Sequence, residues 1–385
     1  MDKDYSVVVF SHLRWRWVYQ RPQHLLTRLA RHHPVWYLEE PVGEDTDNPW
    51  LEIEDVAPNV SVVRPHLRAA YPFYIGDQVP PLIDLTTRLV AERQIEPLAL
   101  WMYTPMALPV AQRLQPLAVA YDCMDELSAF RFAPPELLER EAQLLAWADV
   151  VFTGGPSLHR AKVGRHANVH CFPSSIDAAH FRRALEPGTR EPADQAALPR
   201  PRLGYFGVVD ERLDYGLLGA VARARPEWQI VMVGPFMKVN PDELPHAPNL
   251  HYLGQRPYEE LPAYIGGWDV AIMPFALNEA TRYISPTKTL EYMAAGRAIV
   301  STPITDVQEP YGEIVHIANG SQAFIEACER ALNEAPAERL RRQQRCQAVL
   351  AQTSWDDTAA RMHALLDQAA NSRLFHTQTP GNYSR

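Results

Sequence analysis

Several signals that identify large protein classes are absent from this sequence. No apolar run approaches the roughly 20 residues of a membrane-spanning helix, and the chain enters an apolar stretch at residues 7–10 with no signal peptide before it. The net charge of −9 argues against a general nucleic-acid binder. We therefore expect a cytoplasmic globular protein without a nucleic-acid partner or a transmembrane segment. Peripheral contact with the inner face of a membrane stays compatible with these features.

Cofactor motifs are scarce as well. The four cysteines, Cys123, Cys171, Cys328 and Cys346, lack both the paired spacing of metal ligands and the density of a disulfide framework. We expect them to be reduced thiols. No Gly-x-Gly-x-x-Gly motif is present, which argues against a dinucleotide cofactor. The sequence therefore predicts no cofactor and no metal site.

The 385 residues do contain a repeated alternation of strand and helix signals. Short apolar runs typical of buried parallel strands alternate with segments of helical periodicity. In the first half these runs are residues 7–10, 35–38, 98–102, 119–122 and 150–153. In the second half they are residues 203–207, 230–233, 250–253, 269–273 and 298–301. The pattern predicts an α/β protein with two doubly wound, Rossmann-like domains.

Composition suggests where the two domains meet. A Pro-rich, charged segment between the two sets of strands is typical of a linker. The expected division is a first domain at 1–185, a linker at 186–201, a second domain at 202–354, a C-terminal helix at 355–372 and a flexible tail at 373–385. Within the first domain, residues 41–81 are rich in Pro, Asp and Glu, and we predict a long surface excursion there with a weak strand at residues 60–63.

The loop after the first strand is rich in arginine and aromatic residues. Such a loop lies at the carboxyl edge of a doubly wound sheet, where these folds bind ligands. Arginine suits phosphates and carboxylates, and aromatic faces suit sugar rings. Candidate ligand-binding residues at this edge are His12, Arg14, Arg21, Tyr103, Asp122 and Asp125. The alternatives are that Trp15 and Trp17 pack in the core beside solvated arginines, and that the aspartates cap helices.

The stretch from Ser285 to Gly296 combines several functional features. Ser285 is predicted to cap a helix at its start and Gly296 at its end. Lys288 and Glu291 are three residues apart, so both side chains point to one side near the helix N-terminus, which itself favours a phosphate. The alternative is a capped helix with a surface ion pair, worth roughly 0.2–0.5 kcal/mol.

The pattern Ser-x-x-Lys-x-x-Glu-Tyr-x-Ala-x-Gly in this stretch resembles the donor-binding helix of retaining GT-B glycosyltransferases, of the group 1 or family 4-like kind. The resemblance covers residues 200–335 well and the first half loosely. It implies a lysine facing the diphosphate of a nucleotide sugar and a glutamate on the ribose. The donor-side residues that it implies are Gly207, Arg212, Arg256, Ser285, Thr287, Lys288 and Glu291. One departure is Tyr283, which stands where many members have a glutamate near the donor sugar.

The resemblance implies a retaining hexosyltransferase of polysaccharide or cell-surface glycan synthesis. Its donor is a nucleotide diphosphate sugar, with uridine favoured and guanosine as the alternative, and its acceptor is a glycan or a lipid-linked sugar. Lys288 and Arg212 would stabilise the departing diphosphate without a metal. Asp125 is the catalytic candidate in the first half, beside Asp122 and His12. The resemblance also implies that the last helix crosses back to the first domain, anchored by Trp355.

Two rival hypotheses remain at this stage. One is a non-catalytic nucleotide-sugar-binding partner protein, which Tyr283 would suit. The other is a nucleotide-sugar epimerase of related fold, which would need more carboxylates and histidines in the cleft than this pattern supplies.

Overall fold

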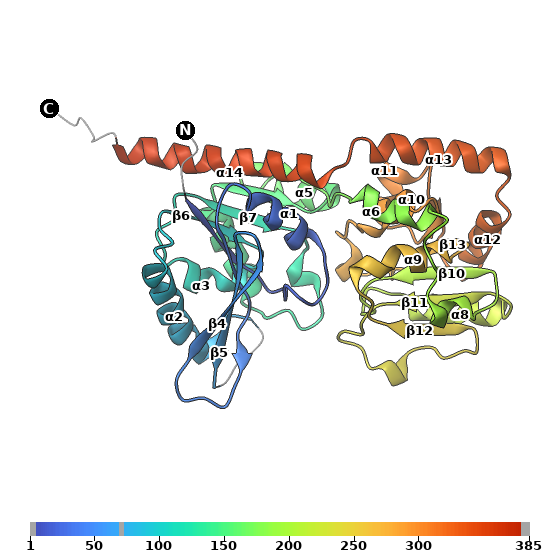
Figure 1. The fold of residues 1–385 in the computed structure, drawn as a ribbon, viewed down its shortest axis with the longest axis horizontal. Coiled ribbons are helices and arrows are strands. Elements are labelled where there is room, and N and C mark those ends of the chain that lie inside the picture. The colour runs from blue at the N-terminus through green and yellow to red at the C-terminus, as the bar shows by residue number, and fades with distance from the viewer. Residues whose placement is uncertain (1–4, 69–72, 379–385) are drawn as a thin grey trace.

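The computed structural model describes residues 5–68 and 73–378, with side chains up to residue 372. Two lobes lie side by side along the long axis of the molecule, each built on its own sheet (Figure 1). The chain follows the strand and helix alternation of the sequence through both lobes. The prediction of an α/β protein with two doubly wound domains is therefore confirmed.

The first lobe is built on a nine-stranded, mostly parallel sheet with the order β3-β5-β2-β1-β6-β7-β8-β9, in which β4 pairs with β5. Its central strands are β1 (Ser6–Phe10), β2 (Val35–Leu38), β6 (Leu98–Met102), β7 (Val119–Cys123), β8 (Val150–Thr153) and β9 (Val169–Cys171). Helices α1 (Arg21–Leu29), α2 (Val79–Glu92), α4 (Leu137–Trp147) and α5 (Pro156–Lys162) connect them. Strands β1, β6, β7 and β8 are buried along their whole length, as strands covered on both faces must be.

The weak strand predicted at 60–63 is confirmed, but the expected surface excursion at 41–81 is wrong for much of its length. It contains β3 (Val42–Gly43), β4 (Trp50–Ala57) and β5 (Val60–Leu67). Strand β5 lies parallel to β2, and β4 returns antiparallel along it. The acidic residues of β4 concealed the strand because they pair across it, as Glu52 does with Arg64 at 2.7 Å.

The second lobe is built on a six-stranded sheet with the order β12-β11-β10-β13-β14-β15, and every pairing in it is parallel. Its strands are β10 (Arg202–Phe206), β11 (Gln229–Val233), β12 (Leu250–Gly254), β13 (Val270–Met273), β14 (Ala298–Ser301) and β15 (His316–Ile317). The larger helices are α8 (Tyr215–Ala224), α9 (Leu261–Gly266), α10 (Lys288–Ala294), α11 (Thr305–Tyr311), α12 (Ser321–Leu332) and α13 (Pro336–Leu350).

The chain passes into the second lobe earlier than the sequence suggested. Phe181, in α6 (Ala178–Arg182), is completely buried in the core of the second lobe. Gln195, in α7 (Ala193–Ala196), is also completely buried and accepts a hydrogen bond of 2.7 Å from the indole nitrogen of Trp268. The predicted domain boundary at residue 185 and the predicted linker at 186–201 are therefore wrong. This polar segment is packed against the second lobe.

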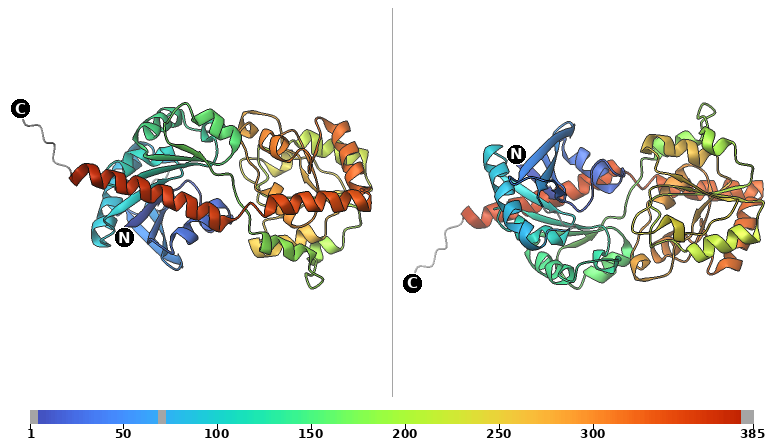
Figure 2. Two further views of the ribbon diagram at one scale, coloured as in Figure 1. Left: turned by 90° about the horizontal axis from the view of Figure 1, so that it is seen from above. Right: turned by 90° about the horizontal axis from the view of Figure 1, so that it is seen from below.

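The last helix, α14 (Trp355–Gln378), returns to the first lobe. From above, α13 lies along the second lobe and α14 continues along the first (Figure 2). Trp355, Met362, Leu366 and Ala370 are buried in one core cluster of the first lobe, so one face of the helix is packed there. The predicted crossing helix is confirmed. It runs to Gln378, beyond the expected start of the tail at 373, and residues 379–385 lie outside the described range.

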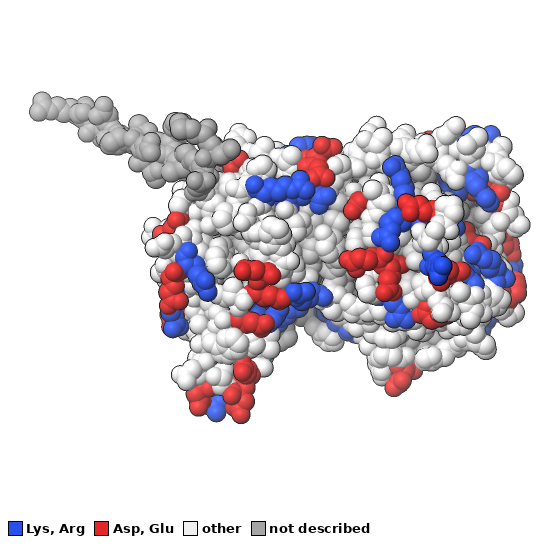
Figure 3. Space-filling view, viewed as in Figure 1, with Lys and Arg blue, Asp and Glu red and all other residues white. Residues whose placement is uncertain are grey.

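None of the helices in the described ranges is both long enough and apolar enough to cross a membrane. On the face drawn in Figure 3, positive and negative side chains are interspersed over both lobes. This face therefore carries no extended patch of one sign.

Candidate active site

A cleft of about 800 Å³ lies between the two lobes. The first lobe contributes the loop at residues 15–21 together with Met124, Asp125 and Gly154. The second lobe contributes the ends of β10 and β11, the segment 255–259 and the segment leading into α10. Both sheets thus present the carboxyl ends of their strands to one space, which is where open α/β sheets bind ligands.

Gly207, directly after β10, makes room for Lys288. A Cβ atom at Gly207 would lie 2.6 Å from Nζ of Lys288 and 2.3 Å from its Cε, so any other residue would displace the lysine. The backbone of Gly207 also has φ +134°, a conformation that other residues rarely adopt. Gly207 is therefore required both by its own backbone and by the lysine beside it.

Lys288 is held among aromatic rings rather than by a carboxylate. Its ammonium lies 5.4 Å from the ring centroid of Tyr205 and 6.0 Å from that of Phe206. Within the described residues, Nζ makes no hydrogen bond or ion pair. Burial lowers the pKa of Lys288 to about 8, and the nearby Arg212 guanidinium lowers it further. The site therefore holds a cation that lacks an anion at bonding distance.

Glu291 lies one turn beyond Lys288 on the same side of α10 and is buried. Burial raises the pKa of its carboxyl to about 7, against the opposing effect of the Lys288 ammonium. In the described part of the chain the two side chains form no ion pair of 4.0 Å or less. The alternative of a surface ion pair on a capped helix is therefore wrong, because Glu291 is buried, Lys288 is half-buried, and both line the cleft without forming an ion pair.

The start of α10 differs from the prediction. The helix begins at Lys288 with Thr287 in the capping position, and Ser285 lies in the preceding loop. Both Ser285 and Thr287 line the cleft. At the other end, Gly296 follows the last turn with φ +70°, as expected for a glycine that ends a helix.

Arg212 and Asp125 approach the cleft from opposite lobes. Asp210 holds the Arg212 guanidinium through both carboxylate oxygens, at 2.7 to 3.0 Å, and the carboxylate raises the pKa of the arginine despite burial. Burial raises the pKa of Asp125 to about 6, while the Arg212, Arg21 and Lys288 cations oppose that rise. The carboxyl of Asp125 in the first lobe therefore faces the same cleft as two cations of the second lobe, Arg212 and Lys288.

Arg256 lines the cleft but is already paired. It donates to Asp194 at 2.7 Å and to the phenol of Tyr264 at 2.6 Å. Its charge is therefore partly used in holding α7 against the second lobe.

Three residues predicted to contact an acceptor have structural roles. Arg21 and Asp122 form a completely buried pair with contacts of 2.9 to 3.2 Å. Arg14 donates to Glu39 at 3.0 Å and to nearby backbone carbonyls, which fixes the loop. Each of these charges therefore has a partner inside the first lobe, although Arg21 also lines the cleft, and the acceptor-side assignment stays a prediction.

His12 and Tyr103 do not reach the cleft. Tyr103 is buried, and neither residue is among those that line the space. Burial lowers the pKa of His12 to about 4, so the imidazole is neutral and a poor base near pH 7. Both assignments to the acceptor side are therefore corrected.

The departure at Tyr283 also has a structural account. Tyr283 belongs to the second lobe, yet it packs against a core cluster of the first, and the Arg282 guanidinium lies 5.2 Å from its ring centroid. Glu279 is far more exposed and pairs with Arg282 at 3.5 Å. Position 283 therefore contributes to the contact between lobes.

Sequence reasoning missed the aromatic contact that closes one end of the cleft. Tyr258 of the second lobe stacks on His180 at 4.1 Å and meets Tyr19 of the first lobe at 4.8 Å between ring centroids. His24 stacks on Trp355 at 4.7 Å. The sequence indicated this contact only through the aromatic residues of the loop after β1, and these do not show which residues of the second lobe they contact.

The chain is similar to several known proteins. Residues 200–334 match the family described as Glycosyl transferases group 1. A teichuronic acid biosynthesis glycosyltransferase of Bacillus subtilis (strain 168), TuaH, is 26% identical over 280 residues, which span 66% of this chain and 68% of that protein.

Solved structures share the fold at low identity. Sucrose-phosphate synthase from Thermosynechococcus elongatus superimposes with a TM-score of 0.72 at 16% identity, covering 97% of this chain and all of that one. The α,α-trehalose 6-phosphate synthase of Burkholderia multivorans gives 0.67 at 16% identity, covering 99% and 100%. A trehalose-6-phosphate structure from E. coli, bound with UDP-2-fluoro glucose, gives 0.66 at 15% identity, covering 94% and 99%.

Proposed function

We propose that this chain, a glycosyltransferase of the group 1 type with a GT-B fold, transfers a hexose from a nucleotide diphosphate sugar to a hydroxyl group. The acceptor is a glycan or a lipid-linked sugar in polysaccharide or cell-surface glycan synthesis. Transfer proceeds with retention of anomeric configuration, as in the family that the donor-side pattern resembles. Uridine diphosphate is the favoured carrier and guanosine diphosphate the alternative.

The observation that carries this proposal is the ammonium of Lys288. Lys288 is half-buried and makes no hydrogen bond or ion pair within the described residues, and a partly desolvated cation without a partner is destabilising. It faces a cleft of about 800 Å³, large enough for a nucleotide sugar. An anionic ligand in the cleft would supply the missing partner.

The chemistry follows from where negative charge develops. When the sugar–phosphate bond breaks, the diphosphate gains charge, and Lys288 and Arg212 both stand at the cleft to stabilise it. Neither cation must reorganise, because aromatic rings hold Lys288 and Asp210 holds Arg212. In this proposal the protein's own cations do the electrostatic work, and no metal is required.

Glu291 takes the donor ribose in this proposal. It lines the cleft one turn from Lys288, and the family that this pattern resembles uses a glutamate at this position to bind the ribose. A carboxylate there can accept hydrogen bonds from ribose hydroxyls.

Asp125 is the candidate base for the acceptor hydroxyl. It enters the cleft from the first lobe, opposite Lys288 and Arg212. With a pKa of about 6, its carboxylate form predominates at neutral pH. In this proposal the acceptor contacts the first-lobe wall of the cleft around Trp17, rather than Arg14 and Arg21.

The uridine preference and the acceptor class have separate support. The structurally related E. coli protein is bound with a UDP-sugar analogue, and the B. subtilis relative acts in teichuronic acid biosynthesis. Bacterial wall and surface glycans of this kind are assembled at membranes, so we also propose peripheral contact with the inner face of the membrane.

The first experiment is a thermal-shift panel of free nucleoside diphosphates and their sugars. A rise in Tm with one base identifies the donor, because a ligand that binds only the folded state stabilises it. Product formation with the matching donor and a glycan acceptor then separates an enzyme from a non-catalytic binding partner. No rise with any nucleotide would refute the donor site, and binding without turnover would favour the partner protein.

A further inference from the structure

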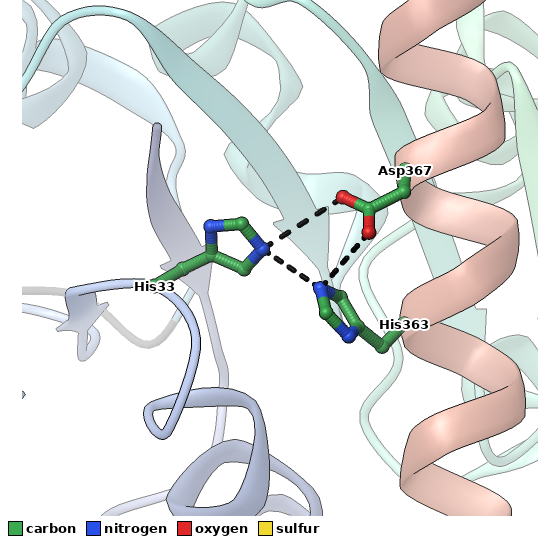
Figure 4. A group of neighbouring side chains, drawn as sticks. All are labelled: His33, His363 and Asp367. Carbon is green, nitrogen blue, oxygen red and sulfur yellow. Dashed lines mark hydrogen bonds and ion pairs between the residues drawn. The ribbon is translucent and has the colours of Figure 1, made fainter. Parts of the chain in front are cut away.

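Two histidines and an aspartate converge in the first lobe, outside the cleft. His33 comes from the loop between α1 and β2, and His363 and Asp367 lie one turn apart on the same face of α14. Figure 4 shows their polar atoms pointing toward one point. None of the three lines the cleft between the lobes.

The distances between these atoms match the spacing of ligands around one ion. Nε2 of His33 lies 2.8 Å from Nε2 of His363 and 3.7 Å from Oδ1 of Asp367, and His363 lies 3.2 Å from Oδ2 of Asp367. A tetrahedral zinc ion with bonds of about 2.0–2.1 Å separates its ligands by roughly 3.3 Å. The three observed separations bracket that value, so small side-chain movements would centre an ion among them.

The surroundings orient two of the three ligands. Nδ1 of His33 lies 3.0 Å from the backbone carbonyl of Tyr5, and a carbonyl can only accept, so Nδ1 carries the proton. The lone pair of neutral His33 is then on Nε2, which faces the cluster. The phenol of Tyr5 donates to Oδ1 of Asp367 at 2.7 Å. Hydrogen bonds of this kind commonly orient the ligands of metal sites.

The ring of His33 is also held in place by packing. It stacks on the ring of Tyr5, with centroids 3.9 Å apart, so the direction of its Nε2 atom is fixed.

We propose that His33, His363 and Asp367 bind a divalent transition-metal ion, with zinc favoured, and that water completes its coordination. Two imidazoles and a carboxylate are a ligand set that zinc commonly takes. The ion would fasten α14 to the body of the first lobe. It lies outside the cleft that we propose for the transfer chemistry.

An ion at this position on α14 would have a structural role. The same helix begins at Trp355, which stacks on His24 and lines the cleft. His363 lies roughly 12 Å along the helix from Trp355, at 1.5 Å per residue. A metal at this point would hold the crossing helix and, through it, one wall of the cleft.

The test measures metal on the full-length protein after chelator treatment and dialysis. We expect about one zinc per chain by competition with a chromophoric chelator, since this is the one such cluster found in the described residues. Cobalt should give the intense visible absorption of a four-coordinate site. Zinc should also raise Tm, and the rise should saturate with metal.

The variants separate the cluster from adventitious binding. Asp367→Asn keeps the shape of the side chain, and His363→Ala removes one ligand; each should weaken zinc binding at least tenfold. His246→Ala, at an exposed histidine of the second lobe, is the matched control and should change nothing. Circular dichroism verifies that each variant is folded. Equal zinc affinity in Asp367→Asn and the parent, or no zinc bound by the parent, would show that the three residues form only a hydrogen-bonded cluster.

Discussion

Replacing Lys288 by Met should stabilise the unliganded protein and at the same time abolish its response to nucleotide. The methionine keeps an apolar stem beside Tyr205 and Phe206 but removes the ammonium. The pKa of Lys288 falls from 10.5 to about 8, and each unit corresponds to about 1.4 kcal/mol, so the charge costs up to about 3 kcal/mol at neutral pH. This pKa already includes the attraction of Glu291, and because Lys288 is only half-buried we expect a gain of about 1–3 kcal/mol.

The pH dependence of this gain has a definite sign. Because folding lowers the pKa of Lys288, the unfolded chain holds its proton more tightly, and the parent protein gains stability as pH rises from about 8 toward 10.5. The advantage of Lys288→Met should therefore be full at pH 7 and smaller at pH 9.5. An unperturbed surface lysine would show no such trend.

The assay is a pair of melting curves for each protein, with and without the preferred nucleoside diphosphate. Arg223→Met is the matched control, since it removes one positive charge from an exposed position on α8, outside the cleft. We expect Lys288→Met to melt a few degrees higher than the parent without nucleotide and to show no rise with it. A lower Tm together with an unchanged nucleotide response would refute the reasoning.

Two further predictions concern the carboxyls of the cleft. Because burial raises the pKa of Asp125 to about 6, kcat/KM of the parent should fall below pH 6, and Asp125→Asn should lower the rate by about 10²–10⁴-fold and flatten that limb; an unaltered rate would exclude Asp125 as the base. Glu291→Gln should weaken binding of the ribonucleoside diphosphate by about tenfold or more, since hydrogen bonds to charged groups contribute about 1.5–3 kcal/mol. The same variant should bind the dideoxyribose analogue as the parent does, and an equal loss for both ligands would refute the ribose contact.

The fold was predictable because its information is local. Apolar runs of four or five residues mark strands buried on both faces, and the alternation with helices fixes a doubly wound arrangement. Strand β4 was not predicted from the sequence because none of its residues is buried. Its Glu52 instead pairs with Arg64 across the hairpin. The early passage of the chain into the second lobe was not predicted because Phe181 and Gln195 are isolated buried residues in a polar segment. Neither β4 nor this segment has the run of apolar residues by which a buried element is recognised in a sequence.

That three of the residues predicted for the donor would lie together was predictable for a related reason. Gly207, Lys288 and Glu291 lie in a recognisable order along one domain, and the structure brings them to one wall of the cleft. The zinc cluster shows the opposite case. His33 and His363 are 330 positions apart, and no spacing rule connects residues at that distance.

The first lobe shows why counting charges in a loop does not identify a binding site. Arg14, Arg21 and Lys288 look alike in the sequence, since each follows a strand or starts a helix at a carboxyl edge. What separates them is whether the fold supplies a carboxylate. Asp122, 101 positions away, neutralises Arg21 completely inside the lobe, whereas Lys288 has only aromatic rings and distant charges around it. A half-buried cation that the described residues leave without an anion is partly desolvated, and an anionic ligand would offset that cost. That argument depends on contacts in space, and it is the reason we assign the anion site to Lys288 and withdraw it from the arginines.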